Sequence, residues 1–546
     1  MLGGKGAFFM TGRRVLGLYA ALLLGFGVVL CRLYALAQNY SYASHAAAQT
    51  TVTLTLPSRR GNFYDCNGLL LTGVEQRWQA LCFPGENGYA RLYDFTDPQG
   101  QALLYRNRSR PAPFLLEVDR DLSALGFRCY PAAQRYPSAP LCRHLIGYLD
   151  SEGKGAAGLE KALDKVLSGT GAQDVIRCGV TARGTLRAGQ QPEWIRQDSG
   201  AAGVQLTISR PVQSAAEAVA AQYMTTGCIL VLDVPTAAVR AWVSVPAYDP
   251  RDLAASLEEA GSPFLNRPLA CYAAGSVFKP VVAAAGLEEG SLPLYQCTGA
   301  VAVEGQVFRC AGGVPHGEVD LAAALAKSCN GYFVQLGQQL GAQKLRDYAE
   351  TLGFGQSIPL AGRLAAQPGQ LPSAQELAQK GQLANFSFGQ GSFLVTPLQV
   401  AAMMNTLAAG GVYRQPFVVQ GTLEETTGEQ LQAFARPRGQ RVLSSETAAA
   451  LCAMLVQVVE EGTAQDAKGL PGGAGGKTGT AQTGQFAPEG AEYKNLWFAG
   501  FYPAEKPRYT VVVLQDRQLT AAASSPEVFA RVCAALEAAG PVGAAK

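Results

Sequence analysis

Ala-Ala-Gly-Ser-Val-Phe-Lys-Pro, residues 273–280, is the stretch on which the interpretation of this chain depends. It places Ser276 and Lys279 three residues apart at the start of an apolar segment, and Gly275 before them suits a tight entry turn. Residues three apart share one face of a helix, so the hydroxyl and the amine can lie side by side. A serine needs such a neighbouring base to become a nucleophile. The stretch therefore predicts a reactive serine.

This spacing alone is weak evidence, because Ser151 and Lys154 repeat it inside a Gly-rich loop where no helix aligns the two groups. Two further motifs follow Ser276. Ser328-Cys329-Asn330 begins 52 residues after Ser276, and Lys477-Thr478-Gly479-Thr480 begins 149 residues after Ser328. The three motifs in this order distinguish Ser276 from Ser151.

Composition and charge exclude several classes of protein. With 546 residues, 48% of them hydrophobic and 16% charged, the chain is long enough for about two to four folded domains. The net charge is +3 and there is no basic run, so no nucleic-acid partner is expected. Thirteen cysteines occur without a C-x-x-C pair, and His45, His144 and His316 are widely separated. We therefore expect no metal and no cofactor.

The N-terminal segment predicts a membrane anchor. Residues 15–31 contain no charge, and residues 15–37 fit a membrane span at the short end of the range. Three basic residues precede the span and one follows it, which predicts a cytoplasmic tail at 1–14 and export of the remainder. A cleaved signal peptide ending at Ala35-Leu36-Ala37 is the alternative. The length of the apolar run favours the retained anchor.

The exported part changes character near residue 200. Residues 38–200 form a loosely patterned, β-rich region that shows no chemistry, with an alternating strand pattern at 51–56. The region 201–546 predicts an α+β domain whose first and last strands meet in one antiparallel sheet. Its predicted strands are 228–233, 239–245, 497–501 and 509–514, and its predicted helices are 211–224, 281–288, within 320–350, 396–409 and 527–538.

The ordered motifs resemble those of the class B penicillin-binding proteins, the monofunctional D,D-transpeptidases of bacterial peptidoglycan synthesis. The resemblance covers most of the chain after residue 50. Further positions that fit the family pattern are Arg60-Gly61, Asp65, Asn67-Gly68, Arg135-Tyr136-Pro137, His144, Gly147, Gly158-Leu159-Glu160, Tyr248-Asp249-Pro250, Asn266-Arg267, His316-Gly317, Phe388-Gly389-Gln390-Gly391, Thr396-Pro397 and Gly462-Thr463. Departures are Cys66 in place of an Arg, Ser209-Arg210 where an Asp is common, and Ala274 in place of a Pro.

The resemblance implies an α+β architecture in three parts. These are an N-terminal transmembrane helix, a β-rich pedestal of the dimerisation type at 38–200, and a penicillin-binding (transpeptidase) domain at 201–546 that has an antiparallel sheet flanked by helices. The chain would be a single-pass protein of the bacterial cell membrane with its bulk outside the cytoplasm. The process served (division, elongation or spore-wall synthesis) and the acceptor amine stay open.

The resemblance also implies roles for the motif residues. Ser276 would attack a terminal D-Ala–D-Ala bond and form an acyl-enzyme, with Lys279 as base, its pKa lowered by burial and by Lys477. Ser328 would relay the proton to the leaving D-Ala nitrogen, and Asn330 would align the substrate backbone. The remaining substrate-binding residues would be Lys477, Thr478, Gly479 and Thr480. The amides of Ser276 and Thr480 would form the oxyanion hole.

The implied partners are peptidoglycan stem peptides, β-lactam antibiotics and a SEDS-type glycosyltransferase in the membrane. A non-catalytic β-lactam sensor or a scaffold of a wall-synthesis complex is the alternative function. The tail at 1–14 is too short for a signalling module, and the intact Ser276, Lys279 and Lys477 argue against a scaffold. A β-lactamase or D,D-carboxypeptidase is a further alternative, although a β-lactamase has no need of residues 38–200.

The cysteines suggest a separate hypothesis. Cys329 lies inside the Ser328–Asn330 motif, Cys310 lies 19 residues before it, and Cys297 is nearby. In an oxidising compartment Cys310 and Cys329 could form a disulfide that distorts the motif and so controls activity. The competing interpretation, which we favour, is that Cys329 fills a small apolar space.

Overall fold

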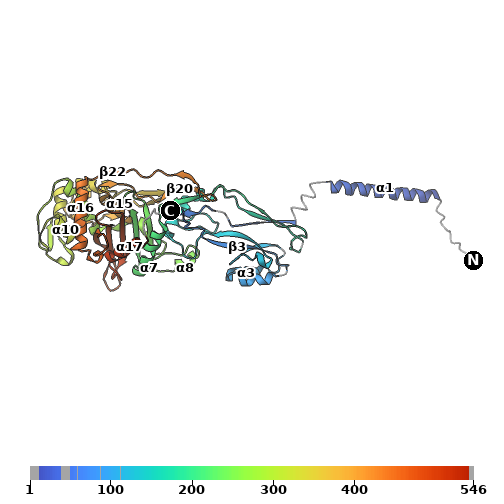
Figure 1. Ribbon diagram of the computed structural model, residues 1–546, viewed down its shortest axis with the longest axis horizontal. Helices are drawn as coiled ribbons and strands as arrows, with labels where there is room; N and C mark the ends of the chain where they lie inside the picture. The colour runs from blue at the N-terminus through green and yellow to red at the C-terminus, as the bar shows by residue number, and fades with distance from the viewer. Residues whose placement is uncertain are drawn as a thin grey trace, which may run out of the picture. The chain divides into compact units, whose positions relative to one another are not determined.

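The computed structural model describes residues 12–38, 50–57, 60–86, 88–110, 112–181 and 183–539. Helix α1 (Gly12–Ala37) has 26 residues and is long and apolar enough to cross a membrane (Figure 1). It contains the whole predicted span 15–37. Most of the predicted tail (1–11) and His45 lie outside the described residues.

The chain forms two compact units, which do not follow a single cut in the sequence. Unit 1 draws on Met1–Ser58, Gln76–Ala132 and Ala172–Asp198, and unit 2 on Arg59–Glu75, Ala133–Gly171 and Ser199–Lys546. The residues predicted as a pedestal therefore contribute to both units.

Unit 1 is β-rich, as its composition predicts. One three-stranded sheet has the order β1-β6-β7 and a second has the order β4-β3-β5, with helix α3 among the elements labelled in Figure 1. Alternate apolar residues of β3 and β4 are buried together with Leu92 and Leu104. The bounds are β1 (Thr51–Thr55), β3 (Glu75–Cys82), β4 (Phe114–Val118), β5 (Arg128–Gln134), β6 (Val175–Gly179), β7 (Glu193–Ile195) and α3 (Pro98–Asn107).

Unit 2 is built on a five-stranded antiparallel sheet of order β10-β9-β25-β24-β23. The pairing of β9 with β25 confirms that the first and last strands of the domain meet. Both faces of the central strands are buried, which explains why β9 is an almost unbroken apolar run. The bounds are β9 (Gly227–Asp233), β10 (Val239–Val245), β23 (Gly475–Phe486), β24 (Glu492–Tyr502) and β25 (Tyr509–Gln518).

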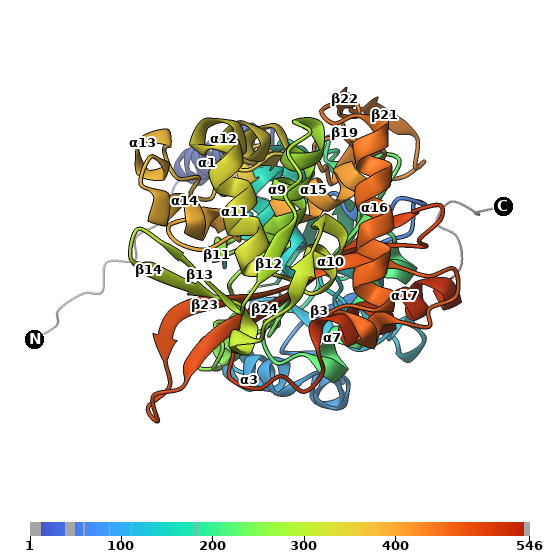
Figure 2. The same ribbon diagram turned by 90° about the vertical axis from the view of Figure 1, so that its left-hand side faces the viewer.

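Helices cover both faces of this sheet (Figure 2). Helices α7 (Arg210–Tyr223) and α17 (Ser525–Ala539) pack together on one face, and α15 (Pro397–Ala408) and α16 (Ser445–Glu460) contact the other. Helix α9 (Lys279–Glu288) is buried among them over its first eight residues. All five predicted helical regions are confirmed.

The predicted helical region 320–350 consists of three helices, α10 (Leu321–Ala326), α11 (Asn330–Leu340) and α12 (Ala342–Thr351). Two residues with positive φ cause the breaks. Ser328 has φ +52° and Gly341 has φ +81°, neither of which a continuous right-handed helix allows. The first break places Ser328 in a loop directly before α11.

A buried ion-pair cluster ties the early segments to unit 2. Glu160, which is 0% exposed, accepts hydrogen bonds from Arg60 Nε at 2.7 Å and from Arg135 Nε at 2.6 Å. Strand β2 (Phe63–Tyr64) pairs with β8 (Ala202–Leu206) close by in the sequence of unit 2. These contacts explain why Arg60, Arg135 and Glu160 recur as sequence landmarks without any visible chemistry.

The predicted turn at 65–68 is also present. The Asp65 carboxylate accepts hydrogen bonds from the backbone N–H groups of Asn67 and Leu69, both at 2.8 Å, and Gly68 has φ +82°. The other carboxylate oxygen accepts from the Arg210 N–H at 3.1 Å, so the turn is fixed to the start of α7.

Candidate active site

Ser276 lies on a short 3-10 turn, Gly275–Phe278, that leads directly into α9. Pro280 follows Lys279 at the start of the helix, where its missing N–H costs nothing. The Ser276 side chain is half-buried, whereas Lys279 is completely buried. The turn therefore presents a serine at the edge of the site and an amine inside it.

The Lys279 amine joins the first motif to the second. Its Nζ donates hydrogen bonds to Ser328 O at 2.7 Å, Ser328 Oγ at 3.0 Å and Asn330 Oδ1 at 2.7 Å. Asn330 in turn donates through Nδ2 to Arg309 O at 2.8 Å. Two motifs that are 52 residues apart in the chain thus meet at one amine.

Glycines bring the third motif against the serine turn. A Cβ at Gly479 would lie 2.9 Å from Val277 Cγ1 and 3.2 Å from Val277 N. A Cβ at Gly275, which also has φ +57°, would lie 2.9 Å from Thr480 O. Strand β23 and the turn can approach this closely only because both positions lack a side chain.

Lys477 is buried within the same strand. Its Nζ donates to Thr478 O and Thr478 Oγ1, both at 3.2 Å. Thr463 Oγ1 and Thr478 Oγ1 share a hydrogen bond of 2.7 Å, so Thr463 supports this motif from outside it. Thr480 is exposed and Thr478 half-buried, which leaves hydroxyls at the surface of the site.

Burial acts strongly on both lysines. It lowers the pKa of Lys279 to about 7 and lowers the pKa of Lys477 well below its usual range, where the nearby charge of Lys279 adds to the effect. Across the described part of the chain, neither amine has a carboxylate partner. Of the two predicted causes for Lys279, burial is therefore the one found, and the influence of one lysine on the other falls on Lys477.

The rival pair behaves as a surface pair. Ser151 and Lys154 are both exposed, and Lys154 Nζ lies 2.6 Å from Glu152 Oε2. The pKa of Lys154 is raised by its hydrogen bond to Glu152, which makes this amine a worse base. Environment thus separates two pairs that share one spacing.

Three cysteines and a histidine gather next to Ser328 and Asn330. Cys310 Sγ lies 3.8 Å from Cys297 Sγ and 3.9 Å from Cys329 Sγ, and His316 Nδ1 lies 3.5 Å from Cys297 Sγ. All thirteen cysteines are free thiols. Sequence separation predicted no metal centre with His316, but the fold brings this histidine and Cys297 to the predicted redox pair. The redox role of Cys310 and Cys329 stays a prediction.

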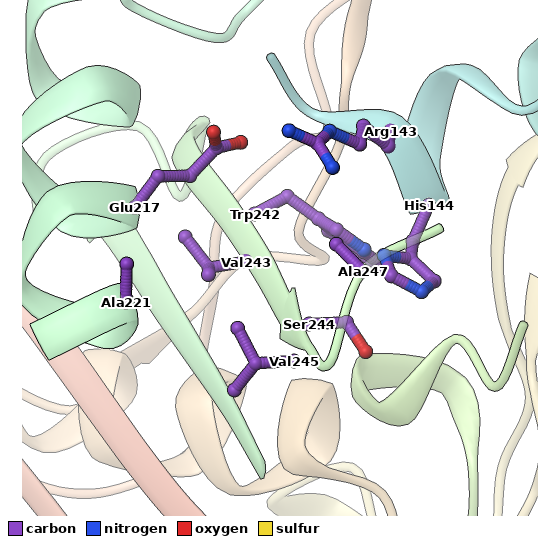
Figure 3. A pocket seen from close by; sticks show the side chains of 9 residues that line it. All are labelled: Arg143, His144, Glu217, Ala221, Trp242, Val243, Ser244, Val245 and Ala247. Atoms are coloured by element: carbon purple, nitrogen blue, oxygen red, sulfur yellow. The ribbon is translucent and has the colours of Figure 1, made fainter. Parts of the chain in front are cut away.

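A separate pocket lies over β10 and α7 (Figure 3). Its titratable groups already have partners: His144 Nε2 is 2.6 Å from Pro263 O, and Glu217 accepts from Cys142 N–H at 2.7 Å. Burial lowers the pKa of His144 to about 4, which keeps the ring neutral. The pocket holds no nucleophile beside a base among its lining residues.

Comparison with known proteins agrees with this geometry. Residues 227–534 match the family model described as the penicillin binding protein transpeptidase domain. The chain is 31% identical over 430 residues to the penicillin-binding protein PbpB of Mycolicibacterium smegmatis, covering 72% of this chain and 62% of the relative. It is 29% identical to the stage V sporulation protein D of Bacillus subtilis, with 73% and 63% covered. The chain thus spans less than two thirds of the length of these two relatives.

A third relative is covered more fully. The peptidoglycan D,D-transpeptidase PbpA of Mycolicibacterium smegmatis is 31% identical, with 71% of this chain and 79% of the relative aligned. Among solved structures, the D,D-transpeptidase domain of a peptidoglycan glycosyltransferase from Eggerthella lenta superposes with a TM-score of 0.64 at 24% identity, covering 89% of this chain and 100% of that one. A chain of a peptidoglycan synthase complex gives 0.69 at 24% identity, covering 98% and 100%. These structures share the fold.

Proposed function

Because the chain belongs to the class B penicillin-binding proteins, we propose that it is a serine-type peptidoglycan D,D-transpeptidase that cross-links stem peptides through an acyl-enzyme and is acylated by β-lactams. One observation carries this proposal. Lys279 is a buried amine with a pKa of about 7, three residues after Ser276 and hydrogen-bonded to Ser328 and Asn330. A base with a pKa near the working pH is what an activated serine requires.

In the first half-reaction Ser276 Oγ attacks the carbonyl carbon of the D-Ala–D-Ala bond. The neutral Lys279 amine accepts the hydroxyl proton as the Oγ–C bond forms. Ser328 Oγ, 3.0 Å from Lys279 Nζ, relays a proton to the leaving D-Ala nitrogen as the C–N bond breaks. The amine thereby returns to its neutral form.

The oxygen of the tetrahedral intermediate needs hydrogen-bond donors. We assign this role to the backbone N–H groups of Ser276 and Thr480, since the turn and β23 are in close contact at Gly275 and Gly479. The loss of one such donor typically costs about 10²–10³ in rate.

The substrate's terminal carboxylate would bind at Lys477, Thr478 and Thr480. Burial leaves the Lys477 amine largely neutral, and an incoming carboxylate would favour its charged form. Asn330 keeps one amide N–H beyond its bonds to Lys279 and Arg309, which suits a backbone carbonyl of the donor peptide.

The acyl group then passes to the side-chain amine of a neighbouring stem peptide. Helix α1 would anchor the chain in the bacterial cell membrane with the N-terminus in the cytoplasm. A SEDS-type glycosyltransferase is the expected membrane partner, and the fold shared with a chain of a peptidoglycan synthase complex supports it.

The test is acylation of the full chain in detergent by a fluorescent penicillin. Wild type and Ser151→Ala should carry a stable adduct, Ser276→Ala should carry none, and wild type should release D-Ala from a stem pentapeptide. Rapid loss of the label would indicate a β-lactamase or carboxypeptidase. A stable adduct without D-Ala release would indicate a sensor, and a folded wild type that never labels would indicate a scaffold.

A further inference from the structure

We propose that Cys297, Cys310, His316 and Cys329 bind one Zn²⁺ ion in a tetrahedral Cys₃His site beside Lys279. One ligand atom from each residue lies within 4.8 Å of all the others. Three of the side chains are buried, and His316 is half-buried, which leaves a path for the ion.

The distances fit one ion. Zn–S bonds of about 2.3 Å and Zn–N bonds of about 2.0–2.1 Å, at tetrahedral angles, separate two sulfurs by about 3.8 Å and a sulfur from a nitrogen by about 3.5 Å. The sulfur pairs Cys297–Cys310 and Cys310–Cys329 are 3.8 and 3.9 Å apart, and Cys297 Sγ is 3.5 Å from His316 Nδ1. A disulfide, by contrast, would need its two sulfurs to approach to about 2.05 Å.

Four short elements supply the ligands. Cys297 ends β12 (Tyr295–Cys297), whose partner β15 (Gly317–Val319) places Gly317 opposite it, so His316 lies next to Cys297. Cys310 directly follows β14 (Gln306–Arg309), and Cys329 is the N-cap residue of α11. The fold therefore assembles ligands that are separated by 12, 5 and 12 residues in the chain.

Backbone N–H groups point at all three sulfurs. Gly299 N donates to Cys297 Sγ at 3.4 Å, the N–H groups of Asn330 and Gly331 donate to Cys310, and that of Tyr332 donates to Cys329. Such donors stabilise negative charge on sulfur, and three of them lie in the first turn of α11, the positive end of its dipole. Outer hydrogen bonds of this kind are a regular part of metal–thiolate sites.

The donor set selects the ion. Three sulfurs and one imidazole nitrogen in tetrahedral array suit Zn²⁺, whereas Mg²⁺, Ca²⁺ and Mn²⁺ prefer oxygen ligands. On binding, each of the three thiols releases its proton and His316 coordinates through neutral Nδ1. The resulting site carries one net negative charge.

The ion would fix the loop that holds Ser328. Cys329 lies between Ser328 and Asn330, both hydrogen-bonded to Lys279, and Ser328 adopts φ +52°. A metal bond at Cys329 would hold this strained conformation, and it would keep Cys310 and Cys329 from forming a disulfide. This consequence for acylation rests on the proposed function, whereas binding of the ion does not.

The decisive measurement is the metal content of the full chain, purified in detergent with reductant and without chelator. We expect about one zinc per chain by mass spectrometry, and loss of most of it in Cys297→Ser, Cys310→Ser and His316→Ala. The matched controls Cys129→Ser and Cys452→Ser, half-buried thiols outside the cluster, should keep the zinc.

A second measurement on wild type alone guards against variants that do not fold. Exchange of zinc for Co²⁺ should give the intense visible bands and the sulfur-to-metal charge-transfer absorption of a tetrahedral thiolate site. A folded wild type that takes up neither Zn²⁺ nor Co²⁺ would overturn the proposal. So would a Cys310–Cys329 disulfide in metal-free protein alkylated directly in membranes.

Penicillin labelling separates this proposal from the proposed function. Ser276→Ala should keep its zinc. Removal of zinc from wild type with a chelator should slow labelling at least tenfold, and added Zn²⁺ should restore it. Zinc binding without any labelling would refute the function and leave the site standing, and labelling of a protein that never binds zinc would do the reverse.

Discussion

Unit 2 buries two clusters of ionisable side chains and treats them in opposite ways. Around Glu160 the charges are paired, with Arg60 and Arg135 bonded to its two carboxylate oxygens. Around Lys279 two amines are completely buried, and neither has a carboxylate beside it in the described residues; the partners of Lys279 are one carbonyl, one hydroxyl and one amide oxygen.

The difference shows what burial of charge is used for. A buried ion pair recovers its desolvation cost through its partner, so loss of one member leaves an uncompensated charge. A buried amine without a counter-charge instead has its pKa lowered, which is how proteins prepare a base. Substitutions in the first cluster should cost stability, and substitutions in the second should cost chemistry.

The largest expected effect is at Lys279. Lys279→Met keeps the volume and removes the base, so acylation by penicillin should slow by about 10²–10⁴. The melting temperature should not fall, because the amine that is removed is buried at a cost. Lys154→Met, in the exposed pair of the same spacing, is the control and should change neither quantity. A Lys279→Met chain that melts early would place this lysine with the structural cluster.

Glu160→Gln tests the paired cluster. The amide cannot neutralise Arg60 and Arg135, so the free energy of unfolding of unit 2 should fall by about 3–5 kcal/mol, measured by urea denaturation. The chains that remain folded should be acylated at the wild-type rate. The control Glu152→Gln removes an exposed pair with Lys154 and should leave stability nearly unchanged. Slower acylation without destabilisation would remove the distinction between the clusters.

Much of unit 2 could be predicted because its signals are local. The apolar runs of β9 and β25 and the helical pattern of α7 lie in single short stretches, and the order of Ser276, Ser328 and Lys477 was enough to find the site. The share of 38–200 that folds with unit 2 could not be predicted, because it depends on contacts such as Arg60 with Glu160, 100 residues apart.

The metal-ligand cluster was missed for a similar reason. Cys310 and Cys329 attracted notice through their distance from the Ser328–Asn330 motif, but Cys297 and His316 join them only through the register of β12 with β15. The spacing of these four ligands matches no short zinc motif. The landmark His316-Gly317 was visible in the sequence, and its position before a short strand is the signal that could have linked it to the cysteines.

The pH dependence sharpens the contrast further. If neutral Lys279 is the base, the acylation rate should rise as the pH passes through about 7 and level off above it, with a loss of about tenfold at pH 6. Because this pKa lies below the unfolded value of about 10.4, the folded state binds fewer protons between pH 7 and 10. Wild type should therefore gain stability relative to Lys279→Met as the pH rises through that range. A rate that is flat from pH 6 to 8 would contradict the assignment of the base.

The smallest expected effect is at Thr463, which touches the unpaired cluster only through Thr478. Thr463→Val keeps the shape and removes the 2.7 Å hydrogen bond between the two hydroxyls, a loss of about 1 kcal/mol. Since Lys477 Nζ donates to the same Thr478 Oγ1, the carboxylate-binding strand should lose order, and acylation should slow by several-fold with an unchanged pH profile. Thr463→Ser restores the hydroxyl and should restore the rate. If the serine variant is as slow as the valine variant, the Thr463 methyl group matters through packing, and the hydroxyl pair has no part in positioning Lys477.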